Sequence, residues 1–127
     1  MPGREPFAYA LLRVVPDVGR GEAVNAGIVL FCRGLDFLEL RSHVPTQKLH
    51  ALNAVVDLDA VAEHLETLEL IAAGDPAGGP MAQGPASSRF HWLVAPTSTM
   101  IQPSAVHTGL CSDPRKTIER LYRQLVV

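Results

Sequence analysis

The first 42 residues contain three strand-like apolar runs joined by short connections, and this arrangement constrains the fold more than any other feature. The runs are FAYALLRVV (7–15), VNAGIVLFCR (24–33) and DFLELRS (36–42), which are rich in β-branched and aliphatic residues. Gly34-Leu35 joins the second and third runs, with glycine where a type II′ hairpin prefers it. Because connections this short join antiparallel strands, the sequence predicts a three-stranded antiparallel meander.

A helix is predicted next, between Asp57 as its N-cap and Gly74 as the glycine that ends it. Residues 74–86, GDPAGGPMAQGPA, are almost entirely Gly, Pro and Ala, which predicts a flexible surface loop within one domain. Apolar residues spaced three and four apart form a single stripe along the helix: Leu58, Val61, Leu65, Leu68 and Ala72.

Strand character returns at RFHWLVA (89–95) and again near TMIQPSAV (99–106), before a last helix that begins at Asp113 and Pro114. The resulting order of elements is β-β-β-α-β-β-α. We expect an α+β fold in which about five strands form an antiparallel sheet and the helices pack on one face. A chain of 127 residues suits a single domain, 1–127.

Composition excludes several classes of protein. Hydrophobic residues make up 47% and charged residues 19% of the chain, as in a globular domain. The net charge of −2 gives no overall field that would draw the protein to nucleic acid or to an anionic membrane. No apolar run approaches the ~20 residues of a spanning helix, and the N-terminal stretch lacks the pattern of a signal peptide.

The spacing of the cysteines and histidines indicates neither a disulfide framework nor a metal site. Cys32 and Cys111 are far apart and form no CxxC pair, so we expect a reduced, cytoplasmic protein. The five histidines show no HxxxH or HExxH spacing, and the glycines form no GxxxxGK[ST] or GxGxxG loop. The sequence therefore predicts no metal site, no cofactor, and no nucleic-acid or membrane partner.

Arg13 lies in a strand-like run whose two faces are both apolar, so its guanidinium is expected to be largely buried. A buried guanidinium needs a partner. Glu22, on the far side of the hairpin loop, is close enough in sequence to supply one, and we predict a structural Arg13–Glu22 pair. The alternative is that Arg13 and Arg89 converge on an anionic ligand, with Glu22 beside them.

The stretch SSRFHWLVAPTSTMIQPSAVHTGLCSDP (87–114) is rich in hydrogen-bond donors. Arg89 has a planar fork suited to a carboxylate or phosphate, and the hydroxyl of Ser98 follows it. His107 and Thr108 are expected in a loop before the last helix, whose N-terminus offers free N–H groups. We therefore predict a site for a small anionic ligand, with His107 and Ser98 as candidate catalytic residues. The alternative is a solvated strand face with turn-forming hydroxyls.

Two further features have mainly structural interpretations. Cys111 precedes the last helix, whose N-terminus could acidify the thiol, and the nearby His107 could activate it. Nothing around Cys111 resembles a cysteine hydrolase, so a small structural residue is favoured. Lys116, Arg120 and Arg123 form a basic stripe on the last helix. A solvated face is the first interpretation of this stripe, and a docking surface for a protein partner is the second.

Both ends of the chain resemble a known family. YALLRVVPDVGRGEAVNAGIVLF and SSRFHWLVAPTSTMIQPSAVHTGL together are similar to the bacterial family catalogued as domain of unknown function 3037. The resemblance implies no established activity, but it implies a possible partner, because members are often encoded beside a HipA-like kinase. The pattern matches here at ten positions, among which Asn25 becomes a further candidate ligand-binding residue: Arg13, Glu22, Asn25, Gly27, Arg89, Trp92, Pro96, Ser98, His107 and Gly109.

Two functions remain open on these grounds. The first is a non-catalytic accessory or binding module that acts with a HipA-like kinase. The second is a small hydrolase or transferase that acts on a phosphate or carboxylate substrate with His107, Ser98 and Arg89. Geometry separates them, because the second requires Arg13, Arg89, Ser98 and His107 to line one pocket.

Overall fold

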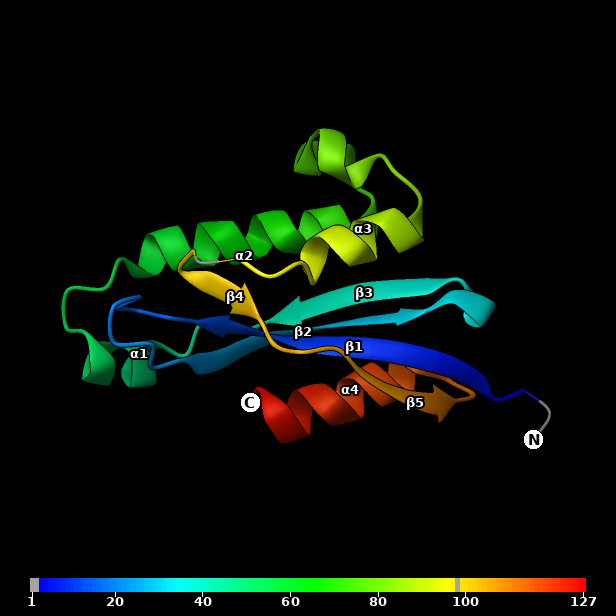
Figure 1. The fold of residues 1–127 in the computed structure, drawn as a ribbon, viewed down its shortest axis with the longest axis horizontal. Helices are drawn as coiled ribbons and strands as arrows, with labels where there is room; N and C mark the ends of the chain where they lie inside the picture. Colours follow the sequence, from blue (N-terminus) through cyan, green and yellow to red (C-terminus); the bar gives the residue numbers. More distant parts are fainter. Residues whose placement is uncertain (1–2, 98) are drawn as a thin grey trace.

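A computed structural model describes residues 3–97 and 99–127. Within these residues the chain forms an α+β fold around a five-stranded antiparallel sheet, which confirms the predicted fold class (Figure 1). The strand order is β3-β2-β1-β4, and β5 pairs with the first half of β1 beside β4. The strands are β1 (Glu5–Val14), β2 (Val24–Cys32), β3 (Phe37–Ser42), β4 (Ile101–Pro103) and β5 (His107–Cys111).

Four α-helices of the described chain pack against this sheet, and they cover both of its faces rather than the single face expected (Figure 1). Helices α2 and α3 lie on one face, called here the α2 face, and α4 lies on the other, the α4 face. The helices are α1 (Thr46–Leu52), α2 (Leu58–Ala73), α3 (Ala86–Leu93) and α4 (Pro114–Leu125), with short 3-10 turns at η1 (Arg33–Leu35), η2 (Pro76–Gly78) and η3 (Pro80–Ala82).

The apolar pattern of β1 and β2 explains why helices are needed on both faces. Leu12 and Val29 are buried in the cluster beneath α2 and α3. Phe7 and Ile28 are buried in a second cluster, with Ile118 of α4. A sheet that is apolar on both sides must be covered on both sides, since its side chains alternate between the two faces.

Helices α2 and α4 begin as predicted. The Asp57 carboxylate accepts a hydrogen bond from the Ala60 N–H, and the Asp113 carboxylate accepts one from the Lys116 N–H. Gly74 ends α2 in the left-handed region, with φ of 71°, where glycine carries no steric penalty.

The predicted strand over residues 89–95 is wrong, because these residues belong to α3 and the turn after it. Phe90 and Leu93 are buried, whereas Trp92 is 43% exposed. In a strand Trp92 would share a face with Phe90, but in a helix it does not. Phe90 stacks on Phe31 of β2, with ring centroids 5.3 Å apart.

The segment after α3 forms two short strands, where the sequence indicated one near 99–106 followed by a loop. The break between β4 and β5 lies at Ser104, whose N–H donates to the Leu11 carbonyl while its hydroxyl accepts from the Leu11 N–H. The predicted loop at His107 is therefore strand β5. The predicted loop over 74–86 contains η2 and η3 and buries the side chain of Ala82.

Candidate functional site

Arg13 lies on the α4 face of β1, between Asn25 of β2 and Gln102 of β4. Its Nε is buried and has no hydrogen-bond partner among the described residues. Asn25 is near the end of α4, because its side-chain amide donates to the Leu125 carbonyl at 3.0 Å. The two family-matched residues are thus cross-strand neighbours beside the C-terminal end of α4.

The predicted Arg13–Glu22 pair is wrong. Glu22 accepts a hydrogen bond from Arg20 Nε at 2.6 Å, in an exposed ion pair within the β1–β2 loop. Two residues this close in sequence meet at little entropic cost, whereas Arg13 is held inside the sheet at a register shift between Leu12 and Arg13.

Arg89 stabilises the junction between α2 and α3. One guanidinium nitrogen donates to the Gly84 carbonyl at 2.6 Å and another to the Ala72 carbonyl at 3.3 Å. The Ala72 carbonyl is in the last turn of α2, where carbonyl groups lack helical partners. The Arg89 guanidinium therefore lies on the α2 face of the sheet, whereas Arg13 lies on the α4 face.

His107 and Thr108 lie at the edge of the sheet. The His107 ring is against Tyr9, with centroids 5.3 Å apart, and both side chains of this part of β5 are exposed. Tyr9 and Arg13 are four residues apart on β1, roughly 13 Å at about 3.3 Å per residue. Ser98, the remaining candidate, lies outside the described residues. The structure thus places Arg13, Arg89 and His107 at three separate locations instead of in one pocket.

The two cysteines lie in the core beneath α4. Burial raises the pKa of the Cys32 thiol, against an opposing hydrogen bond from the Leu35 backbone, and the neighbouring Cys111 raises it further. Cys32 is therefore a neutral thiol near pH 7, and Cys111 is 6% exposed. Neither environment is that of an activated nucleophile.

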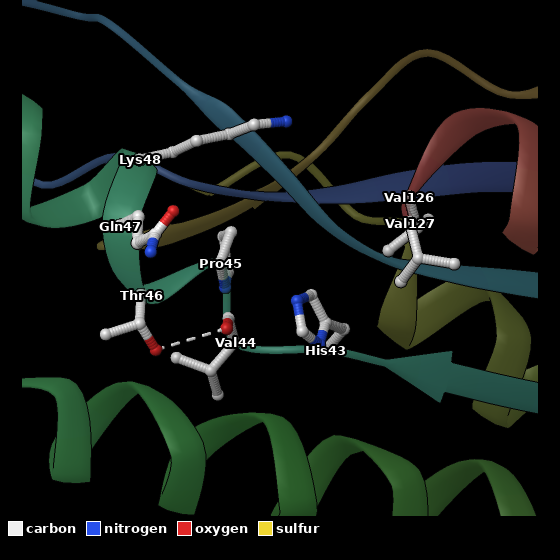
Figure 2. A pocket seen from close by; sticks show the side chains of 8 residues that line it. All are labelled: His43, Val44, Pro45, Thr46, Gln47, Lys48, Val126 and Val127. Atoms are coloured by element: carbon white, nitrogen blue, oxygen red, sulfur yellow. Dashed lines mark hydrogen bonds between the residues drawn. The ribbon is translucent and has the colours of Figure 1, made fainter.

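A hollow of about 490 Å³ lies between α1, the chain that precedes it and the end of α4. Figure 2 shows the His43 ring between Pro45 and the valines Val126 and Val127, with Lys48 extending from α1. His43 and Lys48 are the ionisable side chains of its lining. This arrangement has no base held against a nucleophile.

Two other hollows lie on the α2 face. One, of about 320 Å³, is bounded by α2, α3 and β4 and has an apolar floor that includes Leu12 and Leu68. The other, of about 390 Å³, is a groove between β3 and α2. Within residues 3–97 and 99–127, no group of three or more His, Cys, Asp or Glu residues gathers as metal ligands would.

Among the strands that the structure describes, β5 pairs with β1 alone, so its outer edge is open. The backbone N–H and C=O groups of Leu11 point toward β4 and β5, where they bond to Ser104. Every second residue of β1 points the same way, and Tyr9 is one of them. The backbone groups of His107, which pairs with Tyr9, therefore face β1. Those of Thr108 and Leu110 point outward, because successive residues alternate. Leu110 is 56% exposed.

Fold and surface together define a small α+β protein whose candidate polar residues are dispersed and whose sheet edges are open. The chain belongs to the family described as Protein of unknown function (DUF3037), which matches residues 9–126. The resemblance predicted from the two ends of the chain is thereby confirmed. No curated protein and no solved structure matches the chain. In the described part of the chain, no helix is long and apolar enough to cross a bilayer.

Sequence reasoning missed the β5 edge, although a signal was present. No Asp, Glu, Lys or Arg occurs between Arg89 and Asp113. A charge-free segment that ends in an exposed strand is unusual, since natural proteins protect open edges with charges or proline.

Proposed function

We propose that this protein is a non-catalytic accessory module that binds a protein partner, which adds a strand to the sheet along β5. The observation that carries the proposal is the unprotected edge of β5. Two residues there present backbone donors and acceptors outward, with exposed Leu110 and Val106 beside them. An extended segment of a partner can satisfy such groups through main-chain hydrogen bonds.

A HipA-like kinase is the first partner to test. The family resemblance implies this partner, because members of the family are often encoded beside such a kinase. The charge-free edge suits a partner strand of uncharged residues, because a charged side chain would lose hydration there without gaining an opposite charge.

The hydrolase or transferase alternative stays a prediction. It needs Arg89 and His107 to face one substrate anion, together with Ser98. Arg89 already donates to two carbonyls on the α2 face, whereas His107 is against Tyr9 on the α4 face. This geometry favours the binding module over an enzyme with those residues.

The test is co-expression with a tagged HipA-like kinase encoded beside a gene of this family. Leu110→Lys places a charge on the open edge without disturbing the core, and we expect it to lower the recovered complex about tenfold. Val55→Lys is the matched control, since Val55 is 88% exposed far from β5 in the sequence. On complex formation the amides of Thr108 and Leu110 should become protected from hydrogen exchange.

Equal recovery of the two variants would contradict binding through β5. If the unaltered protein recovers no kinase, then the kinase is not the partner.

A further inference from the structure

The second sheet edge, at β3, is also open and lies beside a helix. The His43 N–H donates to the Ala26 carbonyl of β2, which shows which residues of β3 direct their backbone groups toward β2. Because the backbone groups of successive residues alternate, those of Leu38 and Leu40 point away from β2. Among the described strands β3 pairs with β2 alone, so these outward groups have no strand partner.

A groove of about 390 Å³ runs beside this edge, between β3 and α2. Its floor is apolar and is formed by Leu38 and Leu40 of the strand and by Leu70 and Ala73 of the helix. A strand added to β3 would direct every second side chain toward this floor and the other side chains away from it. The groove therefore suits an extended segment with an aliphatic residue at alternate positions.

Charge on the helix side of the groove selects among such segments. Glu66 and Glu69 line it, and α2 contains acidic residues but no Lys or Arg. Glu69 accepts a hydrogen bond from the Ser42 hydroxyl, whereas Glu66 makes no ion pair or hydrogen bond with the rest of the described chain. The Glu39 carboxylate, which also lines the groove, is paired with Arg41. The negative charge that no basic side chain of the described chain compensates therefore comes from Glu66 and Glu69.

We propose that this groove binds an extended basic segment of a protein partner as an additional strand on β3. An aliphatic side chain of the segment lies on the apolar floor. A Lys or Arg two positions away, on the same face of the added strand, reaches Glu66 and Glu69. This site is separate from β5, and its test does not depend on whether the proposed function is correct.

The experiment measures binding of the fluorescent peptide TVTKTVTK by polarisation at low salt. We expect saturable binding that weakens as salt is raised, because exposed charges are screened. TVTETVTE should bind at least about tenfold more weakly, since its carboxylates face those of α2. The amides of Leu38 and Leu40 should gain protection from hydrogen exchange when TVTKTVTK binds.

Paired charge reversals locate the site. Glu66→Lys should weaken binding of TVTKTVTK about fivefold or more. Glu119→Lys makes the same change in net charge on α4, at the opposite face of the sheet, and should leave binding unchanged. Leu110→Lys should also leave it unchanged, which separates this site from β5.

Three results would each overturn the proposal. The first is absence of saturable binding of TVTKTVTK. The second is an equal effect of Glu66→Lys and Glu119→Lys, which would indicate attraction by net charge alone. The third is binding without new protection at Leu38 and Leu40, which would mean that the peptide does not add a strand.

Discussion

At the scale of single residues, two arginines have buried Nε atoms without hydrogen-bond partners in the described part of the chain, Arg13 and Arg89. Both were expected to serve a carboxylate or an anion. Arg89 instead donates to the carbonyls of Gly84 and Ala72, which are backbone acceptors that no side-chain pattern reveals. The sequence could indicate that a guanidinium was partly buried, but a carbonyl partner becomes visible only when the chain is folded.

Arg89 should therefore stabilise the fold. Arg89→Ala removes two charge-assisted hydrogen bonds, and we expect the free energy of unfolding to fall by about 1–3 kcal/mol. Arg89→Lys should recover only part of this loss, since one ammonium cannot reproduce the guanidinium fork. Urea denaturation measures both variants. Arg123→Ala is the control, because its exposed pair with Glu119 contributes about 0–1 kcal/mol. A loss no larger than that of the control would contradict this role.

Cys32 should make stability depend on alkaline pH. Burial raises the pKa of its thiol above the ordinary value of 9.0, so the folded chain holds this proton more tightly than the unfolded chain does. The resulting stabilisation is complete below pH 9.0 and is lost as the pH rises from there through the folded pKa. Cys32→Val removes the titration. Above pH 9.0 we expect the free energy of unfolding of the unaltered protein to fall relative to that of Cys32→Val. A difference that is independent of pH would contradict the inference.

At the scale of elements, α2 and α3 show what the sequence can and cannot predict. Helix α2 has an apolar stripe, a capping aspartate and a terminal glycine, and all three local signals agree. Helix α3 is short, and its ASSRFHWL sequence contains Phe and Trp, which favour strands. Its helical state depends on Phe90 packing against Phe31 and on Arg89 bonding across to α2. Those contacts join distant parts of the chain, so a local pattern did not reveal them.

The error at α3 also explains why the candidate site did not form. The predicted site needed Arg89 on a strand beside the segment that contains His107. Once residues 86–93 are helical and lie above the sheet, Arg89 faces the end of α2. The first three strands were predicted because short connections and apolar runs are local signals. To predict that β5 lies at an edge, one must know the order of the strands in the sheet, and local sequence patterns did not reveal that order.

At the scale of the whole molecule, the net charge of −2 conceals an uneven distribution. Helix α2 contains Asp and Glu but no Lys or Arg, whereas α4 is rich in Lys and Arg. The two helices lie on opposite faces of the sheet (Figure 1). The groove beside β3 opens on the acidic side. Within the described residues, the two open sheet edges and the two faces of opposite charge are distinct surfaces, so each proposed binding site can be altered and tested without disturbing the core between them.

The two core layers should nevertheless unfold together, because β1 and β2 contribute side chains to both. Ile118 of α4 is fully buried on one side of the sheet, while Trp92 of α3 lies on the other side and reports unfolding by fluorescence. Ile118→Ala should lower the free energy of unfolding by about 2–5 kcal/mol. The Trp92 fluorescence midpoint should move by the same amount as the midpoint from far-ultraviolet circular dichroism. Val127→Ala, at an exposed side chain, is the control and should change little. Separate midpoints for the two signals in Ile118→Ala would contradict a single cooperative domain and would mean that the α4 layer unfolds independently.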